Sequence, residues 1–142
     1  MDFDEFFMRH VYLAASKSKD VRTKIGAVLV KDKNIISSGY NGLARGVADL
    51  PERYSNRELK HRMVCHAESN SVTTAARIGI STLGSILFSQ GIPCADCCKN
   101  AIIQGGICEI VVHSQWPNLI FDKNWVESIE LPASLNQPAN SF

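Results

Sequence analysis

The spacing of apolar positions along the chain changes several times between helical and strand-like periods. Phe3, Phe7 and Val11 recur at helical spacing, whereas Ile25–Val30 is a short apolar run with β-branched residues. The helical pattern predicts helices over residues 3–19, 66–78 and 93–103. Strand-like runs predict strands over residues 25–30, 35–40, 85–88 and 107–112, and a last short helix or strand over 125–131.

Turn-forming residues separate these elements. Lys31–Asn34 predicts a hairpin turn, so the first two strands should run antiparallel. Gly79 and the pair at 105–106 are placed to end the second and third helices. Residues 41–64 are rich in glycine, proline and charge, and we expect a long functional loop with one short helix there.

The order of these elements indicates the fold class. Strands separated by helices predict a three-layer α/β/α protein, with helices on both faces of one sheet. The opening hairpin makes a mixed sheet the better prediction than a wholly parallel one. Residues 1–131 carry all the predicted elements and are expected to form a single domain. Residues 132–142 are polar and contain proline, which predicts a loosely held C-terminal tail.

Composition narrows the class of protein. The 142 residues are 45% hydrophobic and 20% charged, within the range of soluble globular domains. The balance of 15 basic and 14 acidic residues argues against a nucleic-acid partner, which a basic excess normally marks. No apolar run approaches the roughly 18 residues of a membrane span, and the acidic start Met1–Glu5 is unlike a secretory signal. We therefore expect a cytoplasmic protein that binds neither nucleic acid nor membrane.

Cysteine placement indicates a metal site rather than disulfides. The chain has 5 cysteines, an odd number, and three of them cluster at Cys94, Cys97 and Cys98. Cys94 and Cys97 lie three apart at the start of a predicted helix, where both sulfurs share a face and the helix N-terminus stabilises thiolates. His66, at the start of another predicted helix, supplies a third ligand. Two cysteines, one histidine and an open fourth position are typical of catalytic zinc.

Glu68 strengthens the catalytic interpretation over its alternatives. It stands two residues after His66, beside the open position, without being needed as a ligand. A redox dithiol would explain neither residue. A closed structural zinc site would need a fourth ligand, for which the candidates are Cys65, His61 and Cys98. We interpret Cys65, Cys98 and Cys108 as packed thiols.

A longer pattern joins these residues to a known family. His66-x-Glu68 followed by Pro93-Cys94-x-x-Cys97 is the signature of zinc-dependent nucleobase deaminases. From about Phe3 to Trp116 the chain resembles the cytidine deaminase superfamily, and within it the deoxycytidylate (dCMP) deaminases. Three further motifs carry the resemblance: Gly-Tyr-Asn-Gly at 39–42, Val-Cys-His-Ala-Glu at 64–68 and Ile-Ile-Gln-Gly-Gly-Ile at 102–107. The fold that this resemblance implies is a five-stranded mixed sheet between helices.

The resemblance also implies a reaction, the hydrolytic deamination of dCMP to dUMP and ammonia in pyrimidine deoxynucleotide metabolism. One Zn²⁺ per chain, bound by His66, Cys94 and Cys97, would activate water. Glu68 would act as base and then as acid. Departures from the family pattern lie at Ser69-Asn70-Ser71, at Gly91-Ile92 and at Cys98. None of these departures removes a metal ligand. The one at Gly91-Ile92 bears on substrate choice.

Substrate contacts follow from the same resemblance. Asn41 is expected to bind the sugar, although it could serve only as a turn residue. The backbone at Ala67 and Ile92 is expected to bond the exocyclic amine. Arg22 and Lys24 are the first choices for the 5′-phosphate. The alternative cations for the phosphate are Arg45, His61 and Arg62.

The resemblance extends to assembly and regulation. It implies a homo-oligomer, with dCTP and dTTP effectors at the loop 43–47 and Mg²⁺ accompanying such a nucleotide. Rival hypotheses are a deaminase of another cytosine nucleoside or nucleotide, a tRNA adenosine deaminase, and a non-enzymatic zinc-stabilised module. The near-zero net charge argues against tRNA, and the intact Glu68 argues against the module.

Overall fold

A computed structural model describes residues 1–118, 121–122 and 124–131 of the chain. The helices are α1 (Phe3–Ala15), α2 (Pro51–Ser55), α3 (Arg57–Met63), α4 (Ala67–Ile78), α5 (Ala95–Cys97) and the π-helical segment η1 (Cys98–Ile102). The strands are β1 (Gly26–Lys31), β2 (Asn34–Tyr40), β3 (Gly42–Leu43), β4 (Val64–Cys65), β5 (Ile86–Ser89), β6 (Glu109–His113) and β7 (Val126–Glu130). The predicted tail, residues 132–142, lies outside the described residues.

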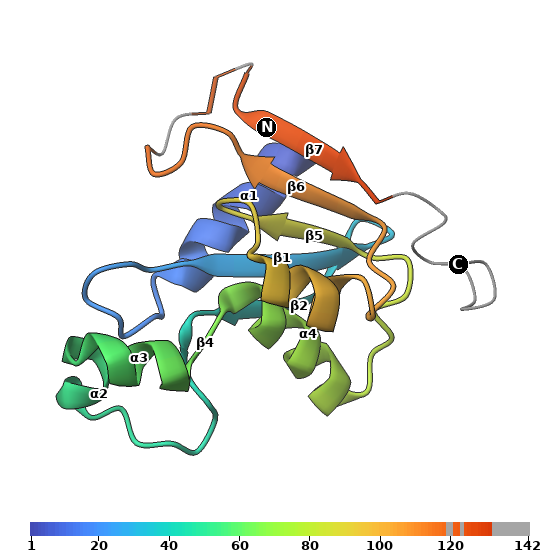
Figure 1. Cartoon of the computed structure of the whole chain (residues 1–142). Helices are drawn as coiled ribbons and strands as arrows, with labels where there is room; N and C mark the ends of the chain where they lie inside the picture. The colour runs from blue at the N-terminus through green and yellow to red at the C-terminus, as the bar shows by residue number, and fades with distance from the viewer. Residues whose placement is uncertain (119–120, 123, 132–142) are drawn as a thin grey trace.

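A five-stranded sheet in the order β2-β1-β5-β6-β7 forms the centre of the molecule. Helix α1 covers one face, and α4 and α5 cover the other (Figure 1). β1 is antiparallel to both β2 and β5, β5 and β6 run parallel, and β6 and β7 are antiparallel. The predicted α/β/α layers and mixed sheet are therefore confirmed. Residues 126–130, predicted as helix or strand, form an edge strand.

The hairpin between β1 and β2 turns at Asp32 and Lys33. Their φ angles are 51° and 62°. Two successive residues with positive φ form the type I′ turn, whose twist matches that of the flanking strands. The hairpin predicted at Lys31–Asn34 is confirmed.

Successive residues of β1 pack into two separate cores, one on each face of the sheet. Val28 packs in a buried cluster with Phe7 and Met8 of α1. Leu29 packs in a second cluster with Ala67 of α4. This alternation follows from the two-residue period of a strand, and it supports a helical layer on both faces.

Two glycines let these helices lie close to the sheet. A Cβ at Gly26 would stand 2.0 Å from the Val11 carbonyl oxygen of α1. A Cβ at Gly39 would stand 2.5 Å from the carbonyl oxygen of Ala67 in α4. Neither backbone contact tolerates a side chain, so α1 would have to move away from the sheet if Gly26 were replaced, and α4 would have to move if Gly39 were replaced.

Helix α1 is shorter than predicted. Asp2 caps it by accepting a hydrogen bond from the Glu5 N–H at 2.8 Å. The helix ends at Ala15, short of the predicted end near Lys19, because the Ser16 hydroxyl donates to a carbonyl oxygen of the last turn at 2.5 Å. The helix over 67–78 ends as predicted, with Gly79 in the left-handed conformation at φ 80°.

The segment 41–64 is more ordered than predicted. We expected a loop with one short helix, and the structure contains two helices. Pro51 is preset for the first turn of α2. Asn56 caps α3 by accepting a hydrogen bond from the Leu59 N–H at 3.0 Å. The prediction was wrong because these two local signals were read only as loop composition.

Strands β3 and β4 pair with each other and so bring together the two ends of the segment 41–64, which we call the excursion 41–64. Gly42 pairs with Cys65 in an antiparallel ladder of two residues on each strand. Asn41 precedes β3 and His66 follows β4, so the ladder brings the end of β2 beside the start of α4. Two positions far apart in the sequence thereby meet at one end of the sheet.

The predicted helix over 93–103 has an unexpected form. Helix α5 covers Ala95–Cys97 and continues as the wider η1, in which the Ile103 N–H donates to the Cys98 carbonyl at 2.9 Å. Such π-helical turns are frequent at functional sites. The spacing of apolar residues could not distinguish an α-helix from a π-helical turn here, because both forms bury the same side of a short helix.

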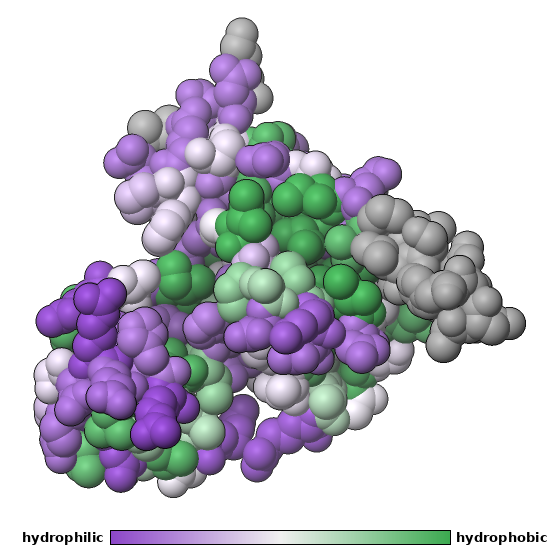
Figure 2. All heavy atoms as spheres, in the orientation of Figure 1, coloured by the Kyte–Doolittle hydropathy of each residue, from purple (hydrophilic) through white to green (hydrophobic). Residues whose placement is uncertain are grey.

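The surface fits this layered core. Hydrophilic residues gather over α2 and α3, and apolar ones are grouped in patches nearer the middle of this view (Figure 2). Across residues 1–118, 121–122 and 124–131, we find no helix with the length and apolar character that crossing a bilayer requires.

Candidate metal centre and active site

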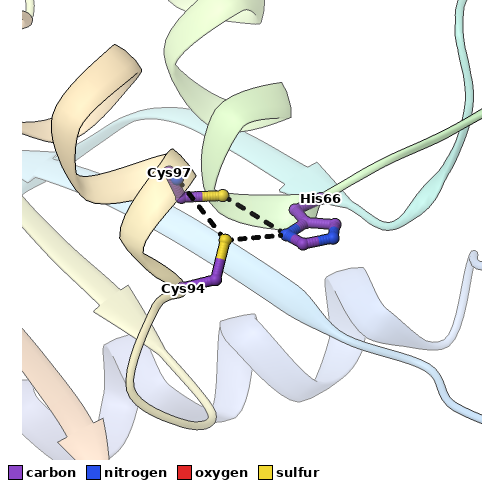
Figure 3. Close-up of side chains that lie close together, drawn as sticks. All are labelled: His66, Cys94 and Cys97. Atoms are coloured by element: carbon purple, nitrogen blue, oxygen red, sulfur yellow. Dashed lines mark hydrogen bonds between the residues drawn. The ribbon is translucent and has the colours of Figure 1, made fainter. Parts of the chain in front are cut away.

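Three metal-ligating side chains converge where α4 and α5 begin (Figure 3). His66 is the N-cap residue of α4, Cys94 is the N-cap residue of α5, and Cys97 ends α5. His66 Nδ1 lies 3.3 Å from Cys94 Sγ and 3.4 Å from Cys97 Sγ. All three donor atoms lie within 4.8 Å of one another. The structure thus brings together the three residues that the sequence pattern selects as ligands.

These separations fit one tetrahedral zinc ion. Zinc bonds of about 2.3 Å to sulfur and about 2.0 Å to nitrogen put the two ligand atoms about 3.5 Å apart at a tetrahedral angle. The observed sulfur–nitrogen distances are close to that value. Cys94 Sγ also accepts a hydrogen bond from the Cys97 N–H at 3.4 Å, which holds both sulfurs on one turn.

The Cys97 thiol needs a cation in order to ionise. Burial raises its pKa to about 12, and the hydrogen bond from the Ser69 hydroxyl at 3.3 Å opposes that rise. A thiol with such a pKa keeps its proton in neutral water and releases it when a metal ion takes its place. The burial of Cys97 therefore suits a metal ligand better than a redox thiol.

Glu68 is a buried carboxyl beside the donor set. It lies in the first turn of α4, and only 7% of its surface is exposed. Oε2 lies 4.0 Å from Cys97 Sγ, and Oε1 accepts a hydrogen bond from the Ser89 hydroxyl at 2.9 Å. A carboxyl in this position can exchange protons with a molecule bound next to the metal without itself being a ligand.

Sequence reasoning missed the two hydroxyls at this site. Ser69 donates to Cys97, and Ser89 donates to Glu68. The signal for Ser89 was a polar residue at the end of the apolar run 86–88. The signal for Ser69 was its departure from the family pattern.

Comparison with known proteins agrees with this geometry. Residues 1–114 match the family model described as the cytidine and deoxycytidylate deaminase zinc-binding region. The chain belongs to the cytidine and deoxycytidylate deaminase family. Human deoxycytidylate deaminase is 34% identical over 120 residues, which cover 80% of this chain and 66% of that protein. This deaminase-family chain thus spans about two thirds of the length of that relative.

Solved structures support the same family. The dCMP deaminase from the cyanophage S-TIM5, in complex with dCMP and dUMP, matches with a TM-score of 0.67 and 31% identity over 79% of this chain and 82% of that chain. The cytidine deaminase from Burkholderia pseudomallei matches with a TM-score of 0.55 and 16% identity over 88% of this chain and 90% of that chain. The second likeness supports the cytidine deaminase-like fold alone.

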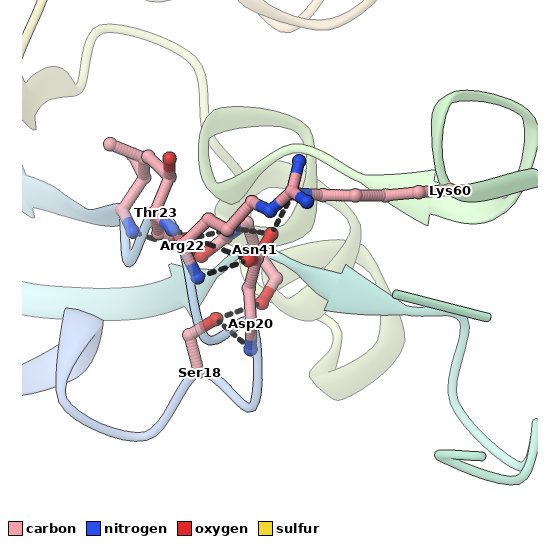
Figure 4. Close-up of polar contacts among 7 residues, drawn as sticks. Ser18, Asp20, Arg22, Thr23, Asn41 and Lys60 are labelled. Atoms are coloured by element: carbon pink, nitrogen blue, oxygen red, sulfur yellow. Dashed lines mark hydrogen bonds and ion pairs between the residues drawn. The ribbon is translucent and has the colours of Figure 1, made fainter. Parts of the chain in front are cut away.

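In this deaminase-family chain, Asn41 holds the segment that leads into β1 (Figure 4). Its Oδ1 accepts a hydrogen bond from the Ile25 N–H at 2.9 Å, and its Nδ2 donates to the Thr23 carbonyl at 2.9 Å. The same Nδ2 lies 3.5 Å from Asp20 Oδ2. The side chain is buried, and the second lone pair of Oδ1 is what it has left for a ligand.

A second amide holds the same segment. Gln90 is buried, its Oε1 accepts a hydrogen bond from the Gly26 N–H at 2.6 Å, and its Nε2 donates to the Lys24 carbonyl at 3.4 Å. The segment 23–26 is therefore fixed on successive backbone groups by Asn41 and Gln90. Sequence reasoning did not select Gln90.

The remaining predicted substrate residues differ in exposure. Lys24 lies in the held segment and Arg22 immediately before it, and both side chains are exposed. Ala67 is fully buried at the start of α4, and Ile92 is 69% exposed in the loop before Cys94.

The other cysteines do not all match their prediction. Cys65 and Cys98 are partly buried, but Cys108 is exposed, so its prediction as a packed thiol was wrong. Cys108 immediately precedes β6, and its thiol donates to carbonyl oxygens at the rim of the sheet rather than pointing into the core.

A pocket of about 690 Å³ adjoins the site. Its lining includes Ser69, Tyr40 and the loop 43–47, whereas none of the three metal donors lines it. Four basic residues line it: Lys17, Lys19, Arg45 and Arg77. Ser69 therefore connects the pocket wall to Cys97 of the donor set.

Proposed function

We propose that this chain catalyses the hydrolytic deamination of dCMP to dUMP and ammonia. The observation that carries the proposal is the buried Glu68 carboxyl, 4.0 Å from the Cys97 sulfur of the His66–Cys94–Cys97 donor set. Relatives named deoxycytidylate deaminase and a neighbour solved with dCMP and dUMP point to the same substrate.

His66, Cys94 and Cys97 would hold one zinc ion per chain. When bound, the ion supplies Lewis-acid activation of a water molecule. The two thiolates balance its charge, and the three protein ligands leave the fourth position for chemistry.

Glu68 moves the protons. Its Oε2 accepts a proton from the attacking water and passes that proton to ring nitrogen N3 of cytosine. Carbon C4 gains the water oxygen and becomes tetrahedral. Glu68 then takes the proton of the new C4 hydroxyl and delivers it to the exocyclic nitrogen; the C4–N bond breaks, the C4 carbonyl of dUMP forms and ammonia leaves. One carboxyl thus serves as base and as acid.

Substrate contacts complete the proposal. The backbone at Ala67 and Ile92 bonds the exocyclic amine, and the free lone pair of Asn41 Oδ1 accepts a hydrogen bond from the sugar. Arg22 and Lys24 bind the 5′-phosphate. Support comes from their exposed side chains and their fixed backbone: Asn41 and Gln90 hold the segment that contains Lys24, and the Arg22 N–H donates to Asp20.

Ammonia release from dCMP, deoxycytidine, CMP and dCTP tests the reaction and the substrate together. We expect dCMP to exceed deoxycytidine by about 10²- to 10⁴-fold in kcat/KM, because two charge-assisted bonds of about 1.5–3 kcal/mol each hold the phosphate. Equal efficiency on both would overturn the nucleotide substrate and favour a nucleoside deaminase. No release from any of the four would favour a zinc-stabilised module.

Two sets of variants assign the roles. Glu68→Gln should keep zinc and lower kcat at least about 100-fold. Arg22→Gln with Lys24→Gln should remove most of the preference for dCMP and leave deoxycytidine turnover unchanged. A surviving preference would move the phosphate site to other cations, with Arg45, His61 and Arg62 tested next.

Regulation and assembly form a further part of the proposal. dCTP and dTTP, with Mg²⁺ on their phosphates, bind the basic pocket beside the loop 43–47, and the chain forms a homo-oligomer. The support is that Lys17, Lys19, Arg45 and Arg77 all line this pocket. Titrating dCMP turnover with each triphosphate should give opposite changes, which Arg77→Gln should reduce. A flat response in the unaltered protein would overturn the effector role.

The domain and its compartment follow from the same chemistry. Residues 1–131 act as one deaminase domain, because the sheet that carries the site runs to β7. The enzyme works in the cytoplasm, where thiol ligands stay reduced. Mass spectrometry of a domain released by proteolysis, and cell fractionation, test these two statements.

A further inference from the structure

We propose that Ser89 is a positioning residue for the deamination reaction and acts through Glu68. Its hydroxyl anchors one carboxyl oxygen of Glu68 so that the other faces the metal-binding donors. This inference rests on the proposed function, which makes Glu68 the proton carrier.

Ser89 lies at a rigid position in the sheet. It is the last residue of β5, is fully buried, and pairs with Ala27 of β1 on one side and Val112 of β6 on the other. Alternation along the strand puts it on the same face as Leu87, which packs in the core with Ala67 of α4. A hydroxyl in such apolar surroundings is unfavourable unless it is hydrogen-bonded, and Glu68 is the partner.

The two carboxyl oxygens of Glu68 have different surroundings. Oε1 accepts the Ser89 hydrogen bond at 2.9 Å. Oε2 lies 4.0 Å from Cys97 Sγ, on the side of the metal donors. Ser89 therefore decides which oxygen is available for proton transfer.

This arrangement suits a carboxyl that moves a proton between two places. Because the Ser89 hydrogen bond holds Oε1, the Glu68 carboxyl can rotate only slightly. Oε2 therefore stays near N3 and the leaving amine of the bound cytosine. The Ser89 hydroxyl can donate to Oε1 whether or not Oε2 carries the proton. The anchor thus persists through the whole cycle.

If Ser89 had a purely structural role, it would only supply a hydrogen bond to the buried Glu68 carboxyl. A neighbouring serine offers the matched control for that role. Ser71 is also fully buried, and its hydroxyl donates to the backbone carbonyl of Glu68 at 2.7 Å rather than to the carboxyl. Ser71→Ala removes a buried hydroxyl that also bonds to Glu68, but it leaves the Glu68 carboxyl and its contacts unchanged.

Steady-state kinetics on zinc-loaded protein test the proposal. Ser89→Ala should lower kcat for dCMP about 10- to 100-fold, with KM changed less than about twofold and zinc content unchanged. Ser89→Thr keeps the hydroxyl and should bring kcat to within about threefold of the unaltered protein. Ser89→Val, which has the shape of threonine but no hydroxyl, should not. Ser71→Ala should stay within about threefold of the unaltered protein. Equal kcat in the Thr and Val variants would overturn the proposal.

A double-mutant cycle shows whether Ser89 acts through Glu68. In a Glu68→Gln background, Ser89→Ala should cause no further loss of kcat, because the group that it positions is already disabled. Multiplicative losses would mean that Ser89 acts by another route and would overturn the proposal.

A readout independent of turnover completes the test. In protein labelled with ¹³C at glutamate carboxyls, the Glu68 signal is the one that Glu68→Gln removes. That signal should move in Ser89→Ala and return in Ser89→Thr. An unmoved signal would overturn the anchor even if no substrate were turned over, so failure of the proposed function and failure of the Ser89 role can be told apart.

Discussion

Lys60 places its ammonium nitrogen 2.6 Å from Oδ2 of Asp20, a carboxylate whose side chain is only 2% exposed. The other oxygen, Oδ1, accepts hydrogen bonds from the Arg22 and Thr23 N–H groups at 2.9 and 3.3 Å (Figure 4). The ion pair therefore fastens α3 to the segment before β1. A helix of the excursion 41–64 and the predicted phosphate-binding segment are held by one buried charge.

The first prediction concerns the strength of this fastening. Lys60→Met should lower the free energy of unfolding by about 3 kcal/mol, because it leaves the Asp20 carboxylate buried without its cation. Lys19→Met is the control, since its ion pair with Asp49 has side chains 68% and 33% exposed. That loss should stay below about 1 kcal/mol. Urea denaturation measures both, and equal losses would contradict the prediction.

Stability should also depend on pH through Asp20. Burial raises the pKa of this carboxyl, but hydrogen bonds from Lys60, Arg22 and Thr23 and the ammonium charge together bring it below the ordinary 3.8. The resulting stabilisation is complete above the unfolded-state pKa and is lost as the pH falls through the lower folded-state value. Denaturation midpoints of the unaltered protein should therefore fall more steeply below about pH 4 than those of Asp20→Asn. Parallel curves would show that Asp20 is not responsible.

Cys94 should be needed both for zinc and for the start of α5. Cys94→Ala removes a ligand and also the acceptor of the Cys97 N–H. Cys94→Ser removes the ligand but keeps a capping oxygen. Both variants should lose the bound zinc, measured by elemental analysis. With metal removed, the serine variant should be more stable than the alanine variant by about 1 kcal/mol. Full zinc content in either would contradict the ligand assignment.

Ser69 should support metal binding from outside the ligand set. Its hydroxyl donates to Cys97 Sγ at 3.3 Å, and such outer contacts typically change metal affinity about 10- to 100-fold. Competition with a chromophoric chelator should show that loss of affinity in Ser69→Ala. Thr73→Ala, at an exposed hydroxyl on the same helix, should leave affinity unchanged. A matching loss in both variants would point to a general effect on α4.

The sequence alone predicted the parts of this molecule that depend on local rules. Alternation and turn chemistry located the β1–β2 hairpin, and Gly79 marked the end of α4. Ligand spacing selected His66, Cys94 and Cys97, because metal coordination restricts residue types strongly.

Contacts between distant parts of the chain escaped prediction. Ser89 reaches Glu68 across 21 positions, and Gln90 reaches Gly26 across 64. Neither partner constrains the local spacing of the other, so a single sequence carries no sign of the pair. The exposure of Cys108 was missed for a related reason, since thiol burial depends on where the adjoining strand ends.

The candidate active site lies on one face of the sheet, and a separate hydrophobic core lies on the other. His66, Glu68 and the two cysteines proposed as ligands belong to the layer of α4 and α5, whereas the cluster of Phe7, Met8 and Val28 lies beneath α1 on the opposite face (Figure 1). Thermal tolerance can therefore evolve by repacking the α1 side, without altering the proposed catalytic residues. A library restricted to that face is the natural starting point for engineering a hardier catalyst.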